Sequence, residues 1–242
     1  MKKTQEEKSA IRRKREQKEL AKWEKGGLGK AFKFAFSHKQ LRWLFIVAAI
    51  WGLGALAIQY YGRIMANYYS TEKVTSALMM YPITCALMML LNGSVGDRIG
   101  RKPVVVAMAA ISLVSFGVLF LACNNHWSPI VAGLLLGSYI GAFYSAGDNI
   151  SSLMTGESAP TNMRASVMSA QSVVNIISKM FAMSVPLVAL FITKDNYTVL
   201  GLLCVFGSLP AMFVSLFFLI TKVGDTSHVN LDTVKGDEWD NK

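Results

Sequence analysis

Cysteine and histidine are scarce in this chain of 242 residues, which contains three of each. They are scattered along the sequence: Cys85, Cys123, Cys204, His38, His126 and His228. The cysteines lie in or at the end of apolar segments, where a thiol usually acts as a small apolar side chain. The pattern therefore indicates neither a disulfide framework nor a cluster of metal ligands, and we expect no metal and no cofactor.

Charged residues are also rare, at 17% of the chain against 52% hydrophobic residues, and the mean hydropathy is +0.37. A soluble domain of this length seldom has that balance. The sequence contains no Gly-x-x-x-x-Gly-Lys-Ser/Thr pattern for nucleotide binding. An integral-membrane enzyme would need nucleophiles, histidines or carboxylates clustered near one membrane face, and the sequence contains no such cluster. We therefore do not expect an enzyme.

Long apolar runs are what the sequence has in abundance. Six of them are near or above the length that spans a bilayer: Leu41–Tyr61, Val74–Leu91, Pro103–Cys123, Pro129–Leu153, Ala165–Ile192 and Tyr197–Thr221. The alternating ten-residue pattern of a membrane β-barrel is missing from the sequence, so these runs are expected to be helices. The predicted fold class is an all-α membrane protein with six transmembrane helices.

The basic residues near the ends of these runs predict the orientation. Nine fall on one side: Lys30, Lys33, Lys39, Arg42, Arg98, Arg101, Lys102, Arg164 and Lys222. Three fall on the other side: Arg63, Lys73 and Lys194. We expect a multi-pass protein of the cell membrane with both termini in the cytoplasm.

The charge is concentrated before the first run. Residues 1–42 hold 14 Lys or Arg and 5 Asp or Glu, which accounts for nearly all of the net charge of +10. We interpret residues 1–40 as a basic cytoplasmic segment held near anionic lipid. Nucleic acid is not an expected partner, although any basic arm can bind it. Residues 41–222 form the membrane bundle, and residues 223–242 form a polar cytoplasmic tail.

Between the second and third runs, residues 93–102 combine three glycines, one acid and three bases. They include Gly93, Gly96, Asp97, Arg98, Gly100, Arg101 and Lys102. Such charges cannot lie in lipid, so we expect a tight turn at the membrane surface. The segment resembles the signature loop of the major facilitator superfamily, which reads Gly, three residues, Asp, Arg or Lys, any residue, Gly and two bases. Every fixed position matches.

A second element lies between the fourth and fifth runs, where the chain reads Glu157-Ser158-Ala159-Pro160-Thr161-Asn162-Met163-Arg164. It resembles the Glu…Pro-Thr…Arg element of sugar and organic-ion transporters in that superfamily. The two elements bring opposite charges to one membrane face, and the resemblance implies a gate in an alternating-access cycle. The alternative is a set of static surface ion pairs. Asp97 could also cap the start of the fifth helix.

Polar groups within the runs are candidates for a substrate or proton path, because such groups are costly in a membrane. Lys179, Asn175 and Gln171 form a stripe on the fifth run, and Lys179 could bind an anion, carry protons or pair structurally with an acid. Asp148 lies about one turn from the end of the fourth run. It could carry a proton or pair with a base, and a position so near the interface fits a structural role equally well. Gln59 and Tyr60 end the first run, where aromatic residues commonly form an interfacial belt.

Gly133, Gly137 and Gly141 recur at every fourth position of the fourth run. This spacing predicts a smooth face on which another helix can pack closely.

The superfamily usually has twelve helices built as two six-helix halves, and this chain resembles the C-terminal half. The resemblance implies secondary transport of a small solute, with protons as the coupling ion and a sugar, organic acid or organic ion as substrate. A separate N-terminal half or self-association would complete the transporter. The alternative is a non-transporting membrane subunit that stabilises another protein.

Overall fold

A computed structural model describes residues 27–58, 60–193 and 197–226 of the chain. The secondary structure of these residues is helical, without a strand among them. Six helical spans are long and apolar enough to cross a membrane: Lys39–Leu56, Thr71–Ile99, Arg101–Asn124, Pro129–Ser158, Arg164–Ile192 and Gly201–Lys222. The predicted fold class, an all-α protein with six membrane-spanning helices, is therefore confirmed.

The helical elements follow one another with short connections. In chain order they are α2 (Leu28–Ser37), α3 (Lys39–Leu53), the 3-10 helix η1 (Gly54–Ala57), α4 (Tyr61–Ala66), α5 (Thr71–Ile99), α6 (Arg101–Asn124), α7 (Pro129–Asp148), the π-helix η2 (Asn149–Met154), α8 (Thr155–Ser158), α9 (Arg164–Thr193) and α10 (Tyr197–Lys222).

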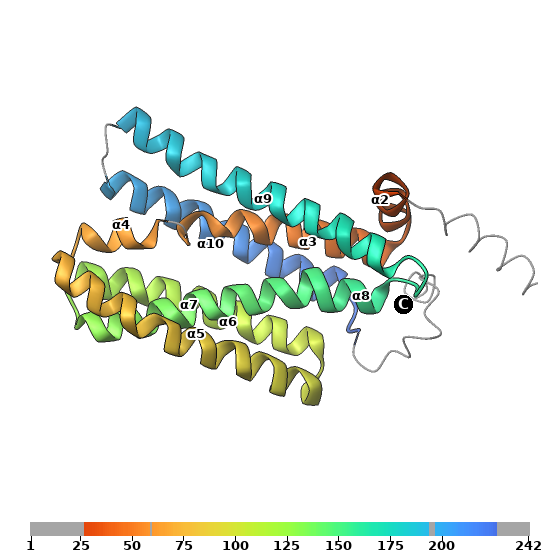
Figure 1. Cartoon of the computed structure of the whole chain (residues 1–242), viewed down its shortest axis with the longest axis horizontal. Helices are drawn as coiled ribbons and strands as arrows, with labels where there is room; N and C mark the ends of the chain where they lie inside the picture. Colours follow the sequence, from red (N-terminus) through yellow and green to blue (C-terminus); the bar gives the residue numbers. More distant parts are fainter. Residues whose placement is uncertain (1–26, 59, 194–196, 227–242) are drawn as a thin grey trace, which may run out of the picture.

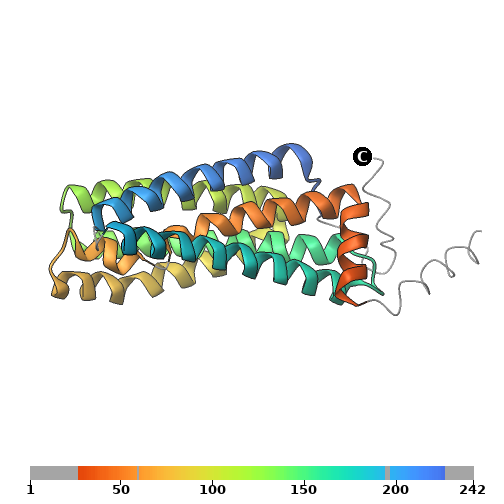
Figure 2. The same ribbon diagram turned by 90° about the horizontal axis from the view of Figure 1, so that it is seen from above.

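The long helices form two packed groups. In one group α7 packs against α5 and α6, and in the other α3 packs against α9 and α10 (Figure 1). Successive spans run in opposite directions, so α5, α8 and α10 end where α3, α6 and α9 begin. We call this the charged end of the bundle. Helix α2 lies across it (Figure 2) and packs on α9 through its buried face of Ala31, Phe34 and Ala35.

Trp51 on α3 joins the two groups in the core. Its indole Nε1 donates a hydrogen bond to the carbonyl of Phe143 on α7 at 3.1 Å, and the two rings stack with centroids 4.9 Å apart. The indole N–H thereby obtains the partner that a buried tryptophan needs. The contact fixes α3 against α7, the helix that carries Tyr144 and Asp148.

The sequence suggested one continuous helix for the first apolar run, but in the structure this run is broken. Helix α3 ends at Leu53, η1 follows, and α4 begins at Tyr61. Glycines at this break allow close packing: a Cβ at Gly52 would lie 2.8 Å from the Cβ of Ser178, and one at Gly54 would lie 2.8 Å from the Cγ of Met212. Glycine weakens a helix, and here it also lets α9 and α10 approach.

The glycine face of α7 lies against α5. A methyl group at Gly133 or Gly137 would overlap the backbone of α5, and one at Gly141 would lie 2.9 Å from the Cα of Cys85. The close approach also lets the hydroxyl of Thr84 donate to the carbonyl of Leu134 at 3.0 Å. The small residues therefore bring two backbones together within the bundle.

Candidate functional site

The segment 93–102 is mostly helical, and the tight turn that we expected there is confined to Gly100. Helix α5 continues through Gly93 and Gly96 to Ile99, and α6 begins at Arg101. The chain reverses at Gly100 alone, which has φ 100° and ψ 162°. This region of backbone conformation is readily open only to glycine. The signature bases therefore project from two helices that meet at a single residue.

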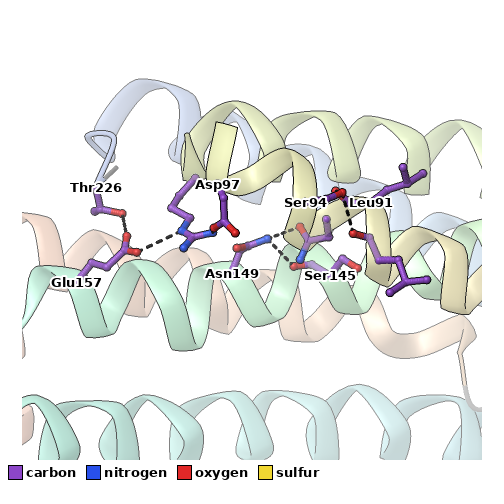
Figure 3. Close-up of polar contacts among 10 residues, drawn as sticks. Leu91, Ser94, Asp97, Ser145, Asn149, Glu157 and Thr226 are labelled. Carbon is purple, nitrogen blue, oxygen red and sulfur yellow. Dashed lines mark hydrogen bonds and ion pairs between the residues drawn. The ribbon is translucent and has the colours of Figure 1, made fainter. Parts of the chain in front are cut away.

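Arg101 lies between two carboxylates at the charged end (Figure 3). Its Nη1 is 3.0 Å from Asp97 Oδ1, and its Nε donates to Glu157 Oε1 at 3.2 Å. The Asp97 side chain is 72% exposed, whereas those of Arg101 and Glu157 are 20% and 18% exposed. Arg101 thus joins the signature segment to the Glu157 element. The carboxylate of Asp97, which the sequence also offered as a cap for the fifth helix, pairs with Arg101.

The remaining residues of the two elements occupy different surroundings. Arg98 is exposed near the end of α5, and Arg164 is the first residue of α9. The Nζ of Lys102 donates to the carbonyls of Ile220 and Val223 at the end of α10. The structure therefore brings Arg101 and Lys102 to two different partners, although they are adjacent in the sequence.

A second polar contact lies along the same seam between α5 and α7. The Asn149 side chain donates to the side-chain oxygen of Asn92 at 2.5 Å and to the carbonyl of Ser145 at 3.1 Å (Figure 3). Asn149 is the first residue of the π-helix η2. A π-helical turn inside an α-helix is frequently found at functional sites. Here it directly follows Asp148.

Lys179 lies fifteen residues into the thirty-residue helix α9. Its Nζ sits over the ring of Tyr144 on α7, 5.3 Å from the centroid, in a cation–π contact. Asp148 follows Tyr144 by one turn on α7, and its charge interacts with that of Lys179. The sequence analysis did not select Tyr144, although this residue stands four positions before Asp148, which it did select.

Asp148 lies deeper than the sequence suggested. The helical span continues through η2 and α8 to Ser158, ten residues beyond Asp148. At 1.5 Å per residue this is about 15 Å from the end of the span, not one turn. The side chain is nevertheless exposed on the surface of the bundle. A carboxylate at that depth is too costly to place in lipid, so this face meets water or another protein surface.

The other polar candidates make internal contacts. Gln171 is fully buried, and its Nε2 donates to the carbonyl of Leu44 on α3 at 3.3 Å. Asn175 faces Gly52, also on α3. The hydroxyl of Tyr60 donates to the carbonyl of Met183 at 3.1 Å. Gln59 lies outside the described residues. Of the stripe on α9, only Lys179 reaches α7.

Metal ligands do not gather in the described part of the chain. Across residues 27–58, 60–193 and 197–226, no three His, Cys, Asp or Glu side chains are grouped so that they could hold an ion. The candidate site consists of Tyr144 and Asp148 on α7 and Lys179 on α9.

Six apolar spans, with opposite charges deep within two of them, define a multi-pass membrane protein. The family model of the Major Facilitator Superfamily matches residues 2–183 and 63–233. The chain belongs to this superfamily, and it is accordingly a membrane transporter in the general sense of that family. Comparisons with curated proteins and with solved structures find no significant match.

Proposed function

We propose that the chain carries out secondary transport of a small solute across the cell membrane by alternating access, with protons as the coupling ion. The observation that carries this proposal is the group formed by Tyr144, Asp148 and Lys179. It places an acid and a base on neighbouring helical spans, each about ten residues or more from either end of its span. Charged groups at such positions mark solute or proton pathways.

The chemistry of the three side chains suggests how they divide the work. Lys179 supplies a positive charge that can bind an anionic group of the solute. Asp148 can take up and release a proton, and the loss of its negative charge on protonation would weaken its attraction to Lys179. Among the substrates suggested by the element from Glu157 to Arg164, this arrangement favours organic acids over neutral sugars.

The pair of Arg101 and Glu157 is the proposed gate. It links the start of α6 to α8, and in the proposed cycle this link holds the charged end closed. We place this end, with both chain termini, on the cytoplasmic side. A pair that is mostly buried and linked by charge-assisted hydrogen bonds can bias a two-state equilibrium, because a difference of a few kcal/mol suffices.

The exposed carboxylate of Asp148 also supports a partner. A second six-helix bundle, either an N-terminal half or another copy of this chain, would cover that face and complete the solute cavity. Facilitators of this superfamily place the substrate between two such halves. We propose this partner as part of the transport function.

A non-transporting subunit is the second candidate. It is favoured by the apolar surface of α9. Only 17% of the apolar stretch of this helix is buried, and large side chains such as Ile176, Phe181 and Phe191 are exposed. The glycine face of α7 offers no docking surface for another protein, because α5 already occupies it. A subunit of this kind would tolerate replacement of Lys179 and Asp148.

Uptake into proteoliposomes separates the two candidates. Radiolabelled organic acids and sugars would be screened with and without an inward proton gradient, using the chain alone and the chain mixed with a candidate N-terminal half. Transport should be saturable and lost in Lys179→Gln. Lys222→Gln is the matched control, because Lys222 also lies over an aromatic ring, that of Trp43 at 6.0 Å, but at the end of α10. Equal uptake by both variants would contradict the proposed site.

A further inference from the structure

Two residues of the short segment that follows α10 are buried, although the segment belongs to no helix. Val223 is 2% exposed and Thr226 is 1% exposed. Residues near a chain's last helix are commonly mobile unless specific contacts tie them down. We call residues 223–226 the C-terminal strap.

The strap is tied to α3 by a reciprocal pair of hydrogen bonds. The backbone N–H of Gly224 donates to Gln40 Oε1 at 2.9 Å, and the Nε2 of Gln40 donates to the carbonyl of Gly224 at 3.1 Å. Gln40 is 4% exposed, so both bonds are shielded from water. One buried amide side chain therefore satisfies both polar groups of one backbone residue.

The strap is tied to α6 by the last base of the signature segment. The Nζ of Lys102 donates to the carbonyls of Ile220 at 2.9 Å and Val223 at 2.6 Å. Its backbone N–H donates to Asp225 Oδ1 at 3.3 Å. Carbonyls at the end of a helix lack partners within the helix, and a cation there is favourable. Lys102 therefore holds the end of α10 and the start of the strap together.

The strap reaches the proposed gate through Thr226. Its hydroxyl donates to Glu157 Oε2 at 2.5 Å, while Arg101 Nε donates to Glu157 Oε1 (Figure 3). Each carboxylate oxygen thus has one donor, and the two donors come from different parts of the chain. Fixing one oxygen restricts rotation of the carboxylate and keeps the other aimed at Arg101.

We propose that Thr226 is a positioning residue of the gate and that the C-terminal strap must detach before the charged end can open. This inference rests on the alternating-access function proposed above. The strap contacts α3, α6 and α8 at once, so a movement that separates these elements has to break its hydrogen bonds. Thr226 acts through Glu157 and does not touch the solute.

Labelling of a cysteine at the deep site tests the inference. Asp148→Cys, combined with Lys179→Gln so that no unpaired charge remains in the span, is introduced into the full chain and reconstituted in vesicles. It is then exposed to a membrane-impermeant thiol reagent added on the side of the charged end. The chain without the new cysteine serves as the blank for the native thiols, of which Cys123 and Cys204 are buried and Cys85 is half-buried. Adding Thr226→Val should raise the labelling rate about tenfold, as expected for loss of one hydrogen bond to a charged group. Adding Thr226→Ser instead should keep the original rate.

Thr221→Val is the matched control. Thr221 lies near the same end of α10, and its exposed hydroxyl donates to the carbonyl of Phe217 at 2.8 Å within the helix. This change should leave labelling at position 148 unaltered. A merely local role of Thr226 in holding the tail would likewise leave a site ten residues inside the span unaltered, so an unchanged rate in Thr226→Val would overturn the inference.

The failure of the gate and the failure of the transport proposal give different results. If position 148 is labelled from neither side in any variant, alternating access through this face is contradicted. If it is labelled at the same rate with and without Thr226→Val, only the strap is contradicted. Glu157→Gln provides a second variant that keeps the shape of the side chain. It should speed labelling, and adding Thr226→Val to it should have little further effect.

Discussion

Arg101 and Glu157 stand 56 positions apart in the sequence and form an ion pair at 3.2 Å in which each side chain is about one-fifth exposed. Arg101 also pairs with Asp97 at 3.0 Å, but that carboxylate is 72% exposed. The guanidinium of Arg101 therefore makes one contact that is shielded from water, with Glu157 on α8. It makes a second contact that is solvated, with Asp97 four residues earlier in the chain. The two contacts should differ in their contribution to stability.

Replacing the two carboxylates by amides should separate these contributions. Asp97→Asn should change the free energy of unfolding by less than about 1 kcal/mol, because exposed ion pairs contribute little. Glu157→Gln should cost about 1.5–3 kcal/mol, because it weakens shielded hydrogen bonds to a charged group. Thermal unfolding of the purified protein in detergent gives both values. Equal shifts for the two variants would contradict the difference in shielding.

Gly100 should tolerate no side chain. Its φ of 100° is unfavourable for any residue with a Cβ, so Gly100→Ala should destabilise the protein by about 1–2 kcal/mol. Gly93→Ala is the control, because Gly93 is helical and a Cβ there meets nothing within 4 Å. The control should be neutral or stabilising by up to about 1 kcal/mol. Both can be measured by thermal unfolding, and the prediction fails if Gly93→Ala is the more damaging change.

The contrast between these glycines shows what the sequence could and could not predict. The six spans follow from apolar runs, because a bilayer imposes a minimum length on a helix. The charges of residues 93–102 predicted a reversal at the membrane surface, and Gly100 makes it. Nothing in the composition of the segment distinguished Gly100 from Gly93 or Gly96. That distinction depends on where the helical hydrogen bonds of α5 stop, which is decided by packing.

The depth of Asp148 was mispredicted for a related reason. Residues 149–158 contain several polar side chains and so resemble the end of a membrane helix. In the structure two of their hydroxyls bond to carbonyls of their own helix: Ser151 Oγ donates to Gly147 at 2.7 Å, and Thr155 Oγ1 donates to Ile150 at 2.9 Å. Polar groups satisfied in this way allow the helix to continue. Tyr144 could not be selected from the sequence, because its contact with Lys179 forms only when α9 packs beside α7.

The glycine face of α7 predicts a sharp steric effect. Gly137→Ala would force a methyl group into the side chain of Thr84 and the backbone of Tyr81, so we expect a loss of about 1–3 kcal/mol. Gly117→Ala on α6 is the matched control, because its Cβ would meet nothing within 4 Å. Thermal unfolding in detergent should show a loss only for position 137. Similar melting temperatures for the two variants would mean that α5 and α7 are not in close contact.

Lys179 and Asp148 can be tested for structural and functional roles separately. Lys179→Gln and Asp148→Asn each leave one charge without its counterpart deep in a membrane span, where an unpaired charge is costly. The double variant leaves no charge, so its folded yield in the membrane should exceed that of either single variant. Its uptake activity should nevertheless be absent, because both the proposed anion-binding charge and the proposed proton carrier are gone. Yield is measured by fluorescence-detected size-exclusion chromatography and activity by proteoliposome uptake. Restoration of both yield and transport in the double variant would assign the pair a purely structural role, whereas restored yield without transport supports the proposed path between α7 and α9.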